Sequence, residues 1–331
     1  MGNNKPLLAH LCLFGSGAFW GLMAPVGKDA MTHGIEGIDM VSFRVLGGAI
    51  LFWLTSLFTR REHIPTTDII KLAGAGLFGL VFNQCCYTIG LSITSPSNSS
   101  IMTTSMPIFA MILSFLILHE PITWKKVAGV LLGCSGAVLI IMTSATAGNA
   151  KVGNIWGDLL CMTAQLSFAL YLSLFKPLVG KYSLFTINKW MFTWASVMIL
   201  PFSASHVASI PWAEVPVSAW WETGYVIFFG TYLGYILMMI GQKTLRPTVV
   251  SVYNYVQPLV SVSVSVLVGL AVFKGTQALA ALLVFSAFGW LSRASRNTTS
   301  TSTTTAWPTR KGMRKLIFMS IKNTSNCPHL I

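Results

Sequence analysis

Charged residues are scarce in this chain. They make up 9% of its 331 residues, and only nine residues are acidic, whereas charged residues form about 25% of an average soluble domain. A chain with so little charge cannot cover a folded surface with polar groups, and 53% of its residues are hydrophobic. The composition therefore excludes a soluble globular protein. It predicts an all-α polytopic membrane protein, because a segment within the bilayer core must satisfy its backbone groups inside a helix.

Metal-binding and catalytic motifs are also lacking. The six cysteines show no paired spacing, and most lie in apolar segments, which is typical of small buried side chains. A membrane-embedded enzyme needs clustered carboxylates or histidines, or a metal site, but the acidic residues here are scattered and no His-Glu-x-x-His motif occurs. No charged ring or filter loop indicates a channel. We therefore expect no metal, no cofactor and no catalytic site. An enzyme acting on a lipid or a lipid-linked substrate is the alternative.

The net charge of +13 does not indicate a nucleic-acid partner. The stretch from Arg293 onward holds seven of the basic residues and no acid, and the other Lys and Arg residues mostly mark the ends of apolar segments. This stretch is also rich in Ser and Thr, as disordered segments often are. We expect a basic cytoplasmic tail, or else an ending produced by a reading-frame change within the last helix.

Long apolar runs fill most of the chain. A transmembrane helix needs about 20 mostly apolar residues, and ten runs approach this length. The first five runs are 7–26, 40–58, 69–89, 96–118 and 124–142, and the second five are 157–175, 184–202, 221–241, 249–272 and 277–291. We therefore predict ten transmembrane helices, of which the last is short.

The second half of the chain repeats the first. A shift of 151 residues, with no gap over nearly sixty residues, places Gly90 on Gly241 and Pro107 on Pro258. Five helices in each copy is an odd number, so the two copies must lie in the bilayer in opposite orientations, with a cavity near the midplane between them. The predicted units are a first five-helix repeat at 1–143, a second, inverted five-helix repeat at 144–292 and the tail at 293–331.

The distribution of Lys and Arg predicts the orientation. Basic residues gather in the short loops that face the cytoplasm. If the N-terminus is cytoplasmic, only Lys28, Lys151 and Lys274 fall in the loops on the outer side. We therefore expect both termini in the cytoplasm and a location in the cell membrane, which is the inner membrane in a bacterium. The lipid bilayer is then one partner of the chain.

Short motifs stand at characteristic places in the first copy. They are Phe19-Trp20-Gly21, Ser42-Phe43-Arg44, Pro107 followed by Leu118-His119-Glu120-Pro121, Trp124, and the glycines Gly129, Gly133 and Gly136. With the two five-helix repeats, they resemble the EamA-like family of the drug/metabolite transporter superfamily over residues 7 to about 285. The resemblance implies a carrier of small metabolites, amino acids or drugs, often working outward. The chain departs from the pattern at Ala271, where the first copy has Glu120.

These features together predict an exporter of an amino-acid-like or drug-like solute that works by alternating access around a central cavity. Large polar and aromatic side chains near the predicted helix centres are the candidates to line this cavity, with hydrogen bonding between helices as their alternative role. The candidates are Trp20, Asn83, Gln84, Tyr87, Gln165, Tyr171, Tyr232, Tyr235, Asn254, Tyr255 and Gln257.

Three basic residues lie in or beside predicted helices. An ionisable group within a span is costly and usually functional, which makes Arg44 a candidate for function or for a structural ion pair. Lys28 and Lys189 have the alternative of extending to the membrane interface. Lys189 is also the approximate counterpart of Arg44 in the second copy. No carboxylate lies deep in a predicted helix, which favours facilitated transport or exchange over proton coupling.

Overall fold

The computed structural model describes residues 5–93, 102–145 and 154–267, together with the single positions Leu279, Leu282, Leu283, Ser286 and Trp290. Within these residues every regular element is a helix, and no strand occurs. The all-α class predicted from composition is therefore confirmed. Residues Met1–Leu291 form one compact unit, and the predicted tail lies outside the described residues.

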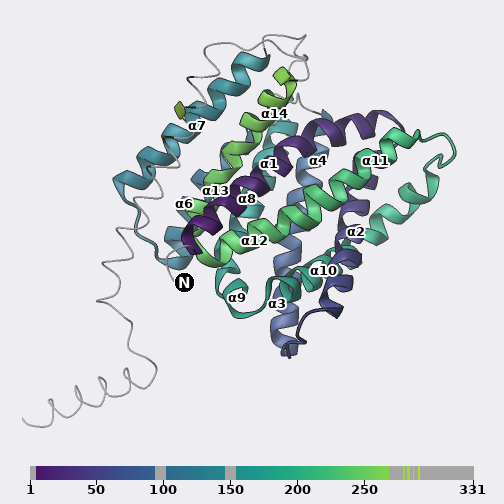
Figure 1. Ribbon diagram of the computed structural model, residues 1–331, viewed down its shortest axis with the longest axis horizontal. Helices are drawn as coiled ribbons and strands as arrows, with labels where there is room; N and C mark the ends of the chain where they lie inside the picture. Colours follow the sequence, from purple (N-terminus) through teal and green to yellow (C-terminus); the bar gives the residue numbers. More distant parts are fainter. Residues whose placement is uncertain are drawn as a thin grey trace, which may run out of the picture. The chain divides into compact units, whose positions relative to one another are not determined.

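The helices follow one another with short connections (Figure 1). Those of the first half are α1 (Lys5–Thr32), α2 (Gly37–Leu57), α3 (Thr66–Gly76), η1 (Leu77–Phe82), α4 (Asn83–Ile93), α6 (Met106–Leu118) and α7 (Trp124–Ala145). Those of the second half are α8 (Ile155–Leu174), α9 (Lys176–Lys181), α10 (Leu184–Ser209), α11 (Val217–Tyr225), η2 (Val226–Leu233), α12 (Gly234–Thr244), α13 (Pro247–Val252), η3 (Tyr253–Tyr255) and α14 (Val256–Leu267).

Six segments of the described chain are long and apolar enough to cross a bilayer. They are Pro6–Met23, Gly37–Leu57, Thr66–Leu91, Ile155–Leu174, Leu184–Ser209 and Val217–Thr244. Helix α6 is apolar but has only 13 residues, and residues 96–101 of the predicted fourth span lie outside the described part. The predicted tenth span, 277–291, is described only at the five single positions. The count of ten therefore stays a prediction.

Apolar side chains cover much of the exposed helix surface. Leu57 is 69% exposed, Leu116 60% and Ile50 59%. So many exposed apolar side chains are a liability in water, but they carry no cost against lipid, where only unsatisfied polar groups are unfavourable. Together with the six long apolar helices, this surface indicates a multi-pass membrane protein.

A π-helical segment interrupts one long helix in each half of the chain. In the first half η1 ends at Phe82 and α4 begins at Asn83, and in the second half η2 ends at Leu233 and α12 begins at Gly234. Phe82 and Leu233 are 151 residues apart, and so are Asn83 and Gly234. This is the same shift that relates the two repeats in the sequence. The π-helical segments were not predicted from the sequence, because the apolar pattern of a span is nearly the same with or without one extra residue in a turn.

The helix contacts also follow the 151-residue shift. Helix α1 packs against α12 and α14, while α8 packs against α4 and α6. Under the shift, α8 corresponds to α1, α12 to α4 and α14 to α6. The contacts of α8 are therefore the contacts of α1 with the two halves exchanged. Helix α2 packs against α10, its counterpart in the other half, and these two helices lie side by side in Figure 1. Each half therefore buries its helices mainly against the other half.

Two glycines allow close approach of helices from the two halves. A Cβ atom on Gly21 of α1 would lie 2.6 Å from the carbonyl oxygen of Gln257 in α14. A Cβ atom on Gly90 of α4 would lie 2.8 Å from the carbonyl oxygen of Gly157 in α8. Only hydrogen fits in such spaces, as is common where membrane helices approach one another closely.

Candidate functional site

A cavity of about 130 Å³ lies among helices of both halves. The predicted candidates that line it are Trp20, Asn83, Gln84, Tyr87, Gln165, Tyr235, Asn254 and Gln257, together with Arg44. The apolar part of the lining includes Met23, Met40, Phe168 and Val226. The cavity thus combines a small number of polar groups with a mainly apolar wall, as small-molecule sites usually do.

The cavity extends in one direction only along α1. Its lining runs from Trp20 in the middle of this helix to Met31 in its last turn, and it includes Met40 near the start of α2 and Leu91 near the end of α4. These three helix ends lie on the face of the molecule that holds the α1–α2 connection. The cavity is therefore directed toward that face.

Aromatic rings form the floor of the cavity in the opposite direction. The ring of Trp20 lies 6.3 Å from that of Phe168 and 5.8 Å from that of Tyr235, both edge-on. Tyr171 lies beneath Phe168 at 5.5 Å and is fully buried. A small space of about 10 Å³ beyond Trp20 reaches Ser16. Below that point the helices are packed together.

Arg44 connects the two halves of the chain at the cavity wall. Its Nη1 group donates to Gln84 Oε1 at 2.6 Å, and its Nε group donates to Thr231 Oγ1 at 3.0 Å. The Thr231 hydroxyl in turn donates to the carbonyl oxygen of Val226, five residues earlier in η2. Gln84 Nε2 extends the network to Asn83 Oδ1 at 3.2 Å. The side chain of Arg44 is thus held in one orientation by uncharged groups.

The π-helical segments supply backbone acceptors for neighbouring helices. A π-turn shifts the hydrogen-bond pattern to the fifth residue and leaves carbonyl groups less well paired. Trp20 Nε1 donates to the carbonyl oxygen of Gly230 at 2.8 Å, and Ser167 Oγ donates to that of Phe78 at 2.8 Å. Gly79 and Gly230 lie in the two π-helical segments and are matched by the 151-residue shift. This match is the sequence feature that could have indicated a shared irregularity in the two helices.

A second pair of irregular turns lies at the prolines that match in the two halves. Thr104 and Ser105 form a turn before Pro107, and the 3-10 turn η3 at Tyr253–Tyr255 comes before Pro258. Proline has no N–H to continue the helical bonding. Thr103 and Asn254, which are 151 residues apart, both line the cavity next to these turns. Interrupted helices of this kind often form binding sites in transporters.

Polar contacts join the two halves on the face opposite the cavity opening. Asp68 in α3 accepts hydrogen bonds from Lys181 Nζ at 2.5 Å and from the Tyr182 hydroxyl at 2.6 Å. The hydrogen bond to Asp68 raises the pKa of Lys181 to about 12. Glu62 accepts from the backbone N–H of Ser183 at 2.9 Å. We call Glu62, Asp68, Lys181, Tyr182 and Ser183 the closing contacts.

Lys176 lies beside the closing contacts and binds the end of α12. Its ammonium group donates to the carbonyl oxygens of Gln242 and Leu245. A cation at this position balances the negative end of the helix dipole. Burial lowers the pKa of Lys176 to about 8.

Three predicted cavity tyrosines lie elsewhere. Tyr171 donates its hydroxyl to Gln242 Oε1 at 3.0 Å below the aromatic floor. Tyr255 points toward α7 and donates to the carbonyl oxygen of Val130 at 3.2 Å. Tyr232 packs on the ring of Phe52 at 5.0 Å. Their place near the helix centre does not determine which side of the helix they occupy, and in the structure all three contact neighbouring helices.

The predicted counterpart of Arg44 does not share its position. Lys189 Nζ lies 4.6 Å above the ring of Trp53, outside the cavity lining. This is a cation–π contact, and the extension of Lys189 toward the interface stays a prediction. The side chain of Lys28 lies outside the described residues.

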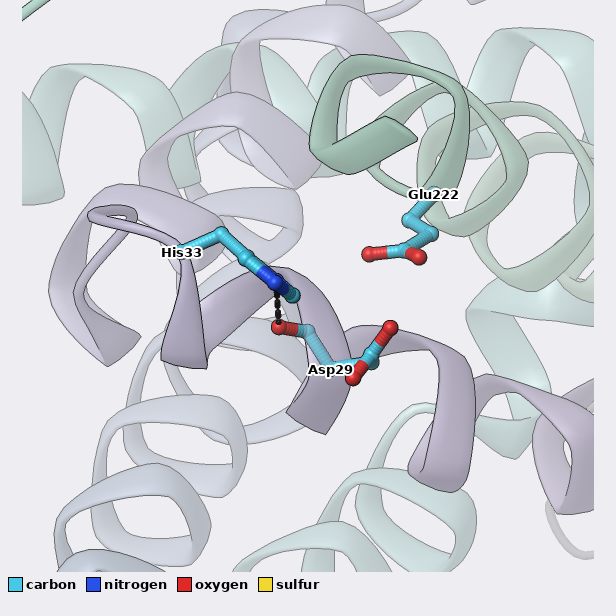
Figure 2. A group of neighbouring side chains, drawn as sticks. All are labelled: Asp29, His33 and Glu222. Carbon is cyan, nitrogen blue, oxygen red and sulfur yellow. Dashed lines mark hydrogen bonds between the residues drawn. The ribbon is translucent and has the colours of Figure 1, made fainter. Parts of the chain in front are cut away.

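A group of titratable side chains gathers at the end of α1 (Figure 2). Asp29 lies in the last turn of α1, His33 directly follows this helix, and Glu222 comes from α11. Their ligand atoms lie within 4.8 Å of one another. His33 Nδ1 is hydrogen-bonded to the Asp29 carbonyl oxygen at 2.8 Å, which Figure 2 shows as a dashed line. Metal binding was not expected from the sequence. Asp29 and His33 are exposed, and exposed carboxylates often gather without an ion, so the group alone does not establish a metal site.

Comparison with known proteins shows the relationship of the chain. The sequence profile of the EamA-like transporter family matches residues 7–142 and 155–293. The uncharacterized transporter YyaM of Bacillus subtilis is 26% identical over 285 residues, covering 85% of this chain and 92% of that protein. An S-adenosylmethionine/S-adenosylhomocysteine transporter of Chlamydia trachomatis is 26% identical over 260 residues, covering 76% of this chain and 79% of that protein.

Two further comparisons agree with this relationship. A probable terminal-alkyne amino-acid exporter of Streptantibioticus cattleyicolor is 24% identical over 212 residues, covering 64% of this chain and 67% of that protein. A crystal structure with a TM-score of 0.71 and 17% identity covers 88% of this chain and 98% of its own, and it supports the fold alone. The profile match extends over both halves of the membrane part. The chain belongs to the EamA-like transporter family of the drug/metabolite transporter superfamily.

Proposed function

We propose that this chain is a carrier that exports a small organic metabolite, an amino-acid-like or drug-like solute, across the cell membrane by alternating access. The observation that carries this proposal is the cavity of about 130 Å³, which is lined by polar side chains from both halves. In a membrane protein, polar groups deep between helices are costly unless they contact water or a ligand. A solute path explains why so many of them share one space.

The names of two related proteins indicate solutes of the kind that we propose. One relative is named as a transporter of S-adenosylmethionine and S-adenosylhomocysteine, and another as a probable exporter of an amino acid. All of these solutes contain an amino-acid group. We propose a solute of the same general size and polarity for this chain, and we base outward transport on the exporter among the relatives.

We further propose that residues 1–143 and 144–292 are inverted five-helix repeats with ten spans in total. The equal spacing of α4 and α12 and the exchanged helix contacts support this arrangement. The loop distribution of Lys and Arg supports cytoplasmic termini. In this orientation the cavity opens to the outside, and the closing contacts face the cytoplasm.

Alternating access then requires the closing contacts to break and the opposite end to close. On the closed face, the contacts that join the halves are polar, as between Asp68 and Lys181. On the open face, the residues packed between the halves are apolar, among them Ala30, Ile35, Val215 and Ala219. Polar contacts on a wet surface are weak, so they can open at low cost.

The test is metabolite profiling followed by transport. Cells with and without the gene are compared for small metabolites inside and outside, and any compound depleted inside and enriched outside is then assayed in proteoliposomes with the purified protein. We expect saturable transport of at least one amino-acid-like or drug-like solute. Identical profiles, with no flux of any candidate in proteoliposomes, would contradict the proposal.

A further inference from the structure

Within the residues that the structure describes, no acidic group neutralises the positive charge of Arg44. Its side chain is 7% exposed and lines the cavity. All nine acidic residues of the chain lie within the described residues, and no ion pair joins any of them to Arg44. Its two hydrogen-bond acceptors, on Thr231 and Gln84, are uncharged. A buried charge with no counter-ion is costly, so the missing negative charge points to a ligand.

The guanidinium group still has donors to offer. It contains five N–H groups. One on Nε is used by Thr231 and one on Nη1 by Gln84, and Arg44 makes no further hydrogen bond within the described residues. These two bonds fix the plane of the group, and the remaining donors are available to a molecule in the cavity. A planar fork of N–H donors matches the two oxygens of a carboxylate.

Gln165 supplies a second polar group at the cavity wall that can bind a ligand. Its side chain is 6% exposed and lines the same cavity. Across the part of the chain that the structure describes, its amide has no hydrogen-bond partner. Because Gln165 lines the cavity, its amide is available to hydrogen-bond a polar group of a molecule bound there.

We propose that Arg44 binds a carboxylate of the transported solute, while the Gln165 amide binds a polar group of the same molecule. The substrate class is then small organic acids and zwitterions whose apolar part contacts Met23, Met40 and Phe168. This inference rests on the proposed carrier function and narrows its substrate. Neutral and purely cationic solutes fall outside the class, because they leave Arg44 without a counter-ion.

The most informative variant is Gln84→Glu. Its carboxylate takes the place of the amide oxygen that lies 2.6 Å from Arg44 Nη1, so the contact between α2 and α4 is kept while Arg44 gains an internal counter-ion. We expect this variant to fold, but a carboxylate ligand must now compete with a fixed one. Arg44→Gln removes the charge, and Arg44→Lys keeps the charge without the planar fork.

The experiment measures thermal unfolding and proteoliposome uptake with the full-length purified protein. The probes are the twenty common amino acids, the methyl ester of each, and chloride and phosphate as inorganic anions. We expect at least one amino acid to stabilise and be transported, its methyl ester to bind roughly tenfold more weakly or worse because the charged pair is lost, and Gln84→Glu and Arg44→Gln to abolish the difference. Arg44→Lys should retain part of it.

The possible failures separate the two proposals. Equal binding of acid and ester, binding of neutral or cationic solutes only, or undiminished acid binding in Gln84→Glu overturns the role of Arg44 and leaves the carrier function standing. Stabilisation by chloride or phosphate alone overturns the carboxylate assignment. If metabolite profiling and uptake detect no solute of any charge, the carrier function fails and this inference fails with it.

Discussion

The indole Nε1 of Trp20 donates to the backbone carbonyl oxygen of Gly230 at 2.8 Å, which joins the first helix of the chain to the π-helical segment of the second half. Trp20 also forms part of the cavity wall and of its aromatic floor. One side chain therefore couples the packing of the two halves to the shape of the space between them.

Trp20→Phe keeps an aromatic ring but removes the donor to Gly230. Hydrogen bonds between membrane helices contribute about 0.6 kcal/mol on average, so we expect a small fall in thermal stability and a larger fall in transport, because the floor loses its fixed orientation. Unfolding in detergent and uptake in proteoliposomes measure both. Trp221→Phe is the control, since Trp221 is 78% exposed and should leave both unchanged. Unaltered transport in Trp20→Phe would count against the role of the floor.

Gly21→Ala should destabilise the contact between α1 and α14. The added methyl group would lie 2.6 Å from the carbonyl oxygen of Gln257, and backbone atoms cannot move aside as a side chain can. Overpacking of this kind costs about 1–3 kcal/mol. Gly224→Ala is the matched control, because nothing lies within 4 Å of a Cβ atom there. The comparison is made by thermal unfolding, and equal stability of the two variants would show that the helices can separate freely.

Lys181→Gln should weaken the closed face, whereas Lys71→Gln should not. Both lysines pair with Asp68, but Lys71 lies one turn away on the same helix, and only Lys181 joins the two halves. An exposed ion pair contributes about 0.2–1 kcal/mol, so opening should increase by at most about fivefold. The reporter is the labelling rate of Ser16→Cys, in a background without the native cysteines, by an impermeant thiol reagent added from the cytoplasmic side.

The closing contacts should not titrate near neutral pH. Because the hydrogen bond to Asp68 raises the pKa of Lys181 to about 12, its stabilising effect is fully present below the usual lysine pKa of about 10.4 and is lost only as the pH rises through the folded value. The Ser16→Cys labelling rate, corrected for the ionisation of the reacting thiol, should therefore be constant between pH 6 and 7, below the pKa of about 8 of the neighbouring Lys176. A rate that rises steeply within this range would show that other groups control the closed face.

The proposed inverted repeats predict a definite topology. An activity reporter that works only outside the cytoplasm should be silent when fused after Arg296 and active when fused within residues 147–154, because an odd number of spans separates these sites. The control is the same pair of fusions to a reporter that works only inside, which should give the opposite pattern. If both reporters place the two fusions on one side, the two halves cannot be inverted as proposed.

The helical class was predicted from the sequence, and eight of the eleven cavity candidates line the cavity. Their use in substrate binding stays a prediction. Gln84 and Gln165 were candidates because large amides are rare within spans, and this reasoning depends only on the cost of burial. Tyr171 and Tyr255 satisfied the same criterion, yet they contact other helices, because the side of a helix that faces the cavity depends on packing between halves far apart in the chain. The uncharged surroundings of Arg44 are also a long-range property: Thr231 is 187 residues away.

The most direct test of the account is whether the cavity is wet and takes up solute. Gln165→Cys and Leu166→Cys form a matched pair in a background without the native cysteines, since Gln165 lines the cavity and Leu166 is an exposed apolar residue on the same helix. We measure their reaction with an impermeant thiol reagent added to intact cells. The account predicts that Gln165→Cys reacts, that transported solute slows this reaction, and that Leu166→Cys stays inert. An unreactive Gln165→Cys, or a reaction that no transported solute changes, would contradict it.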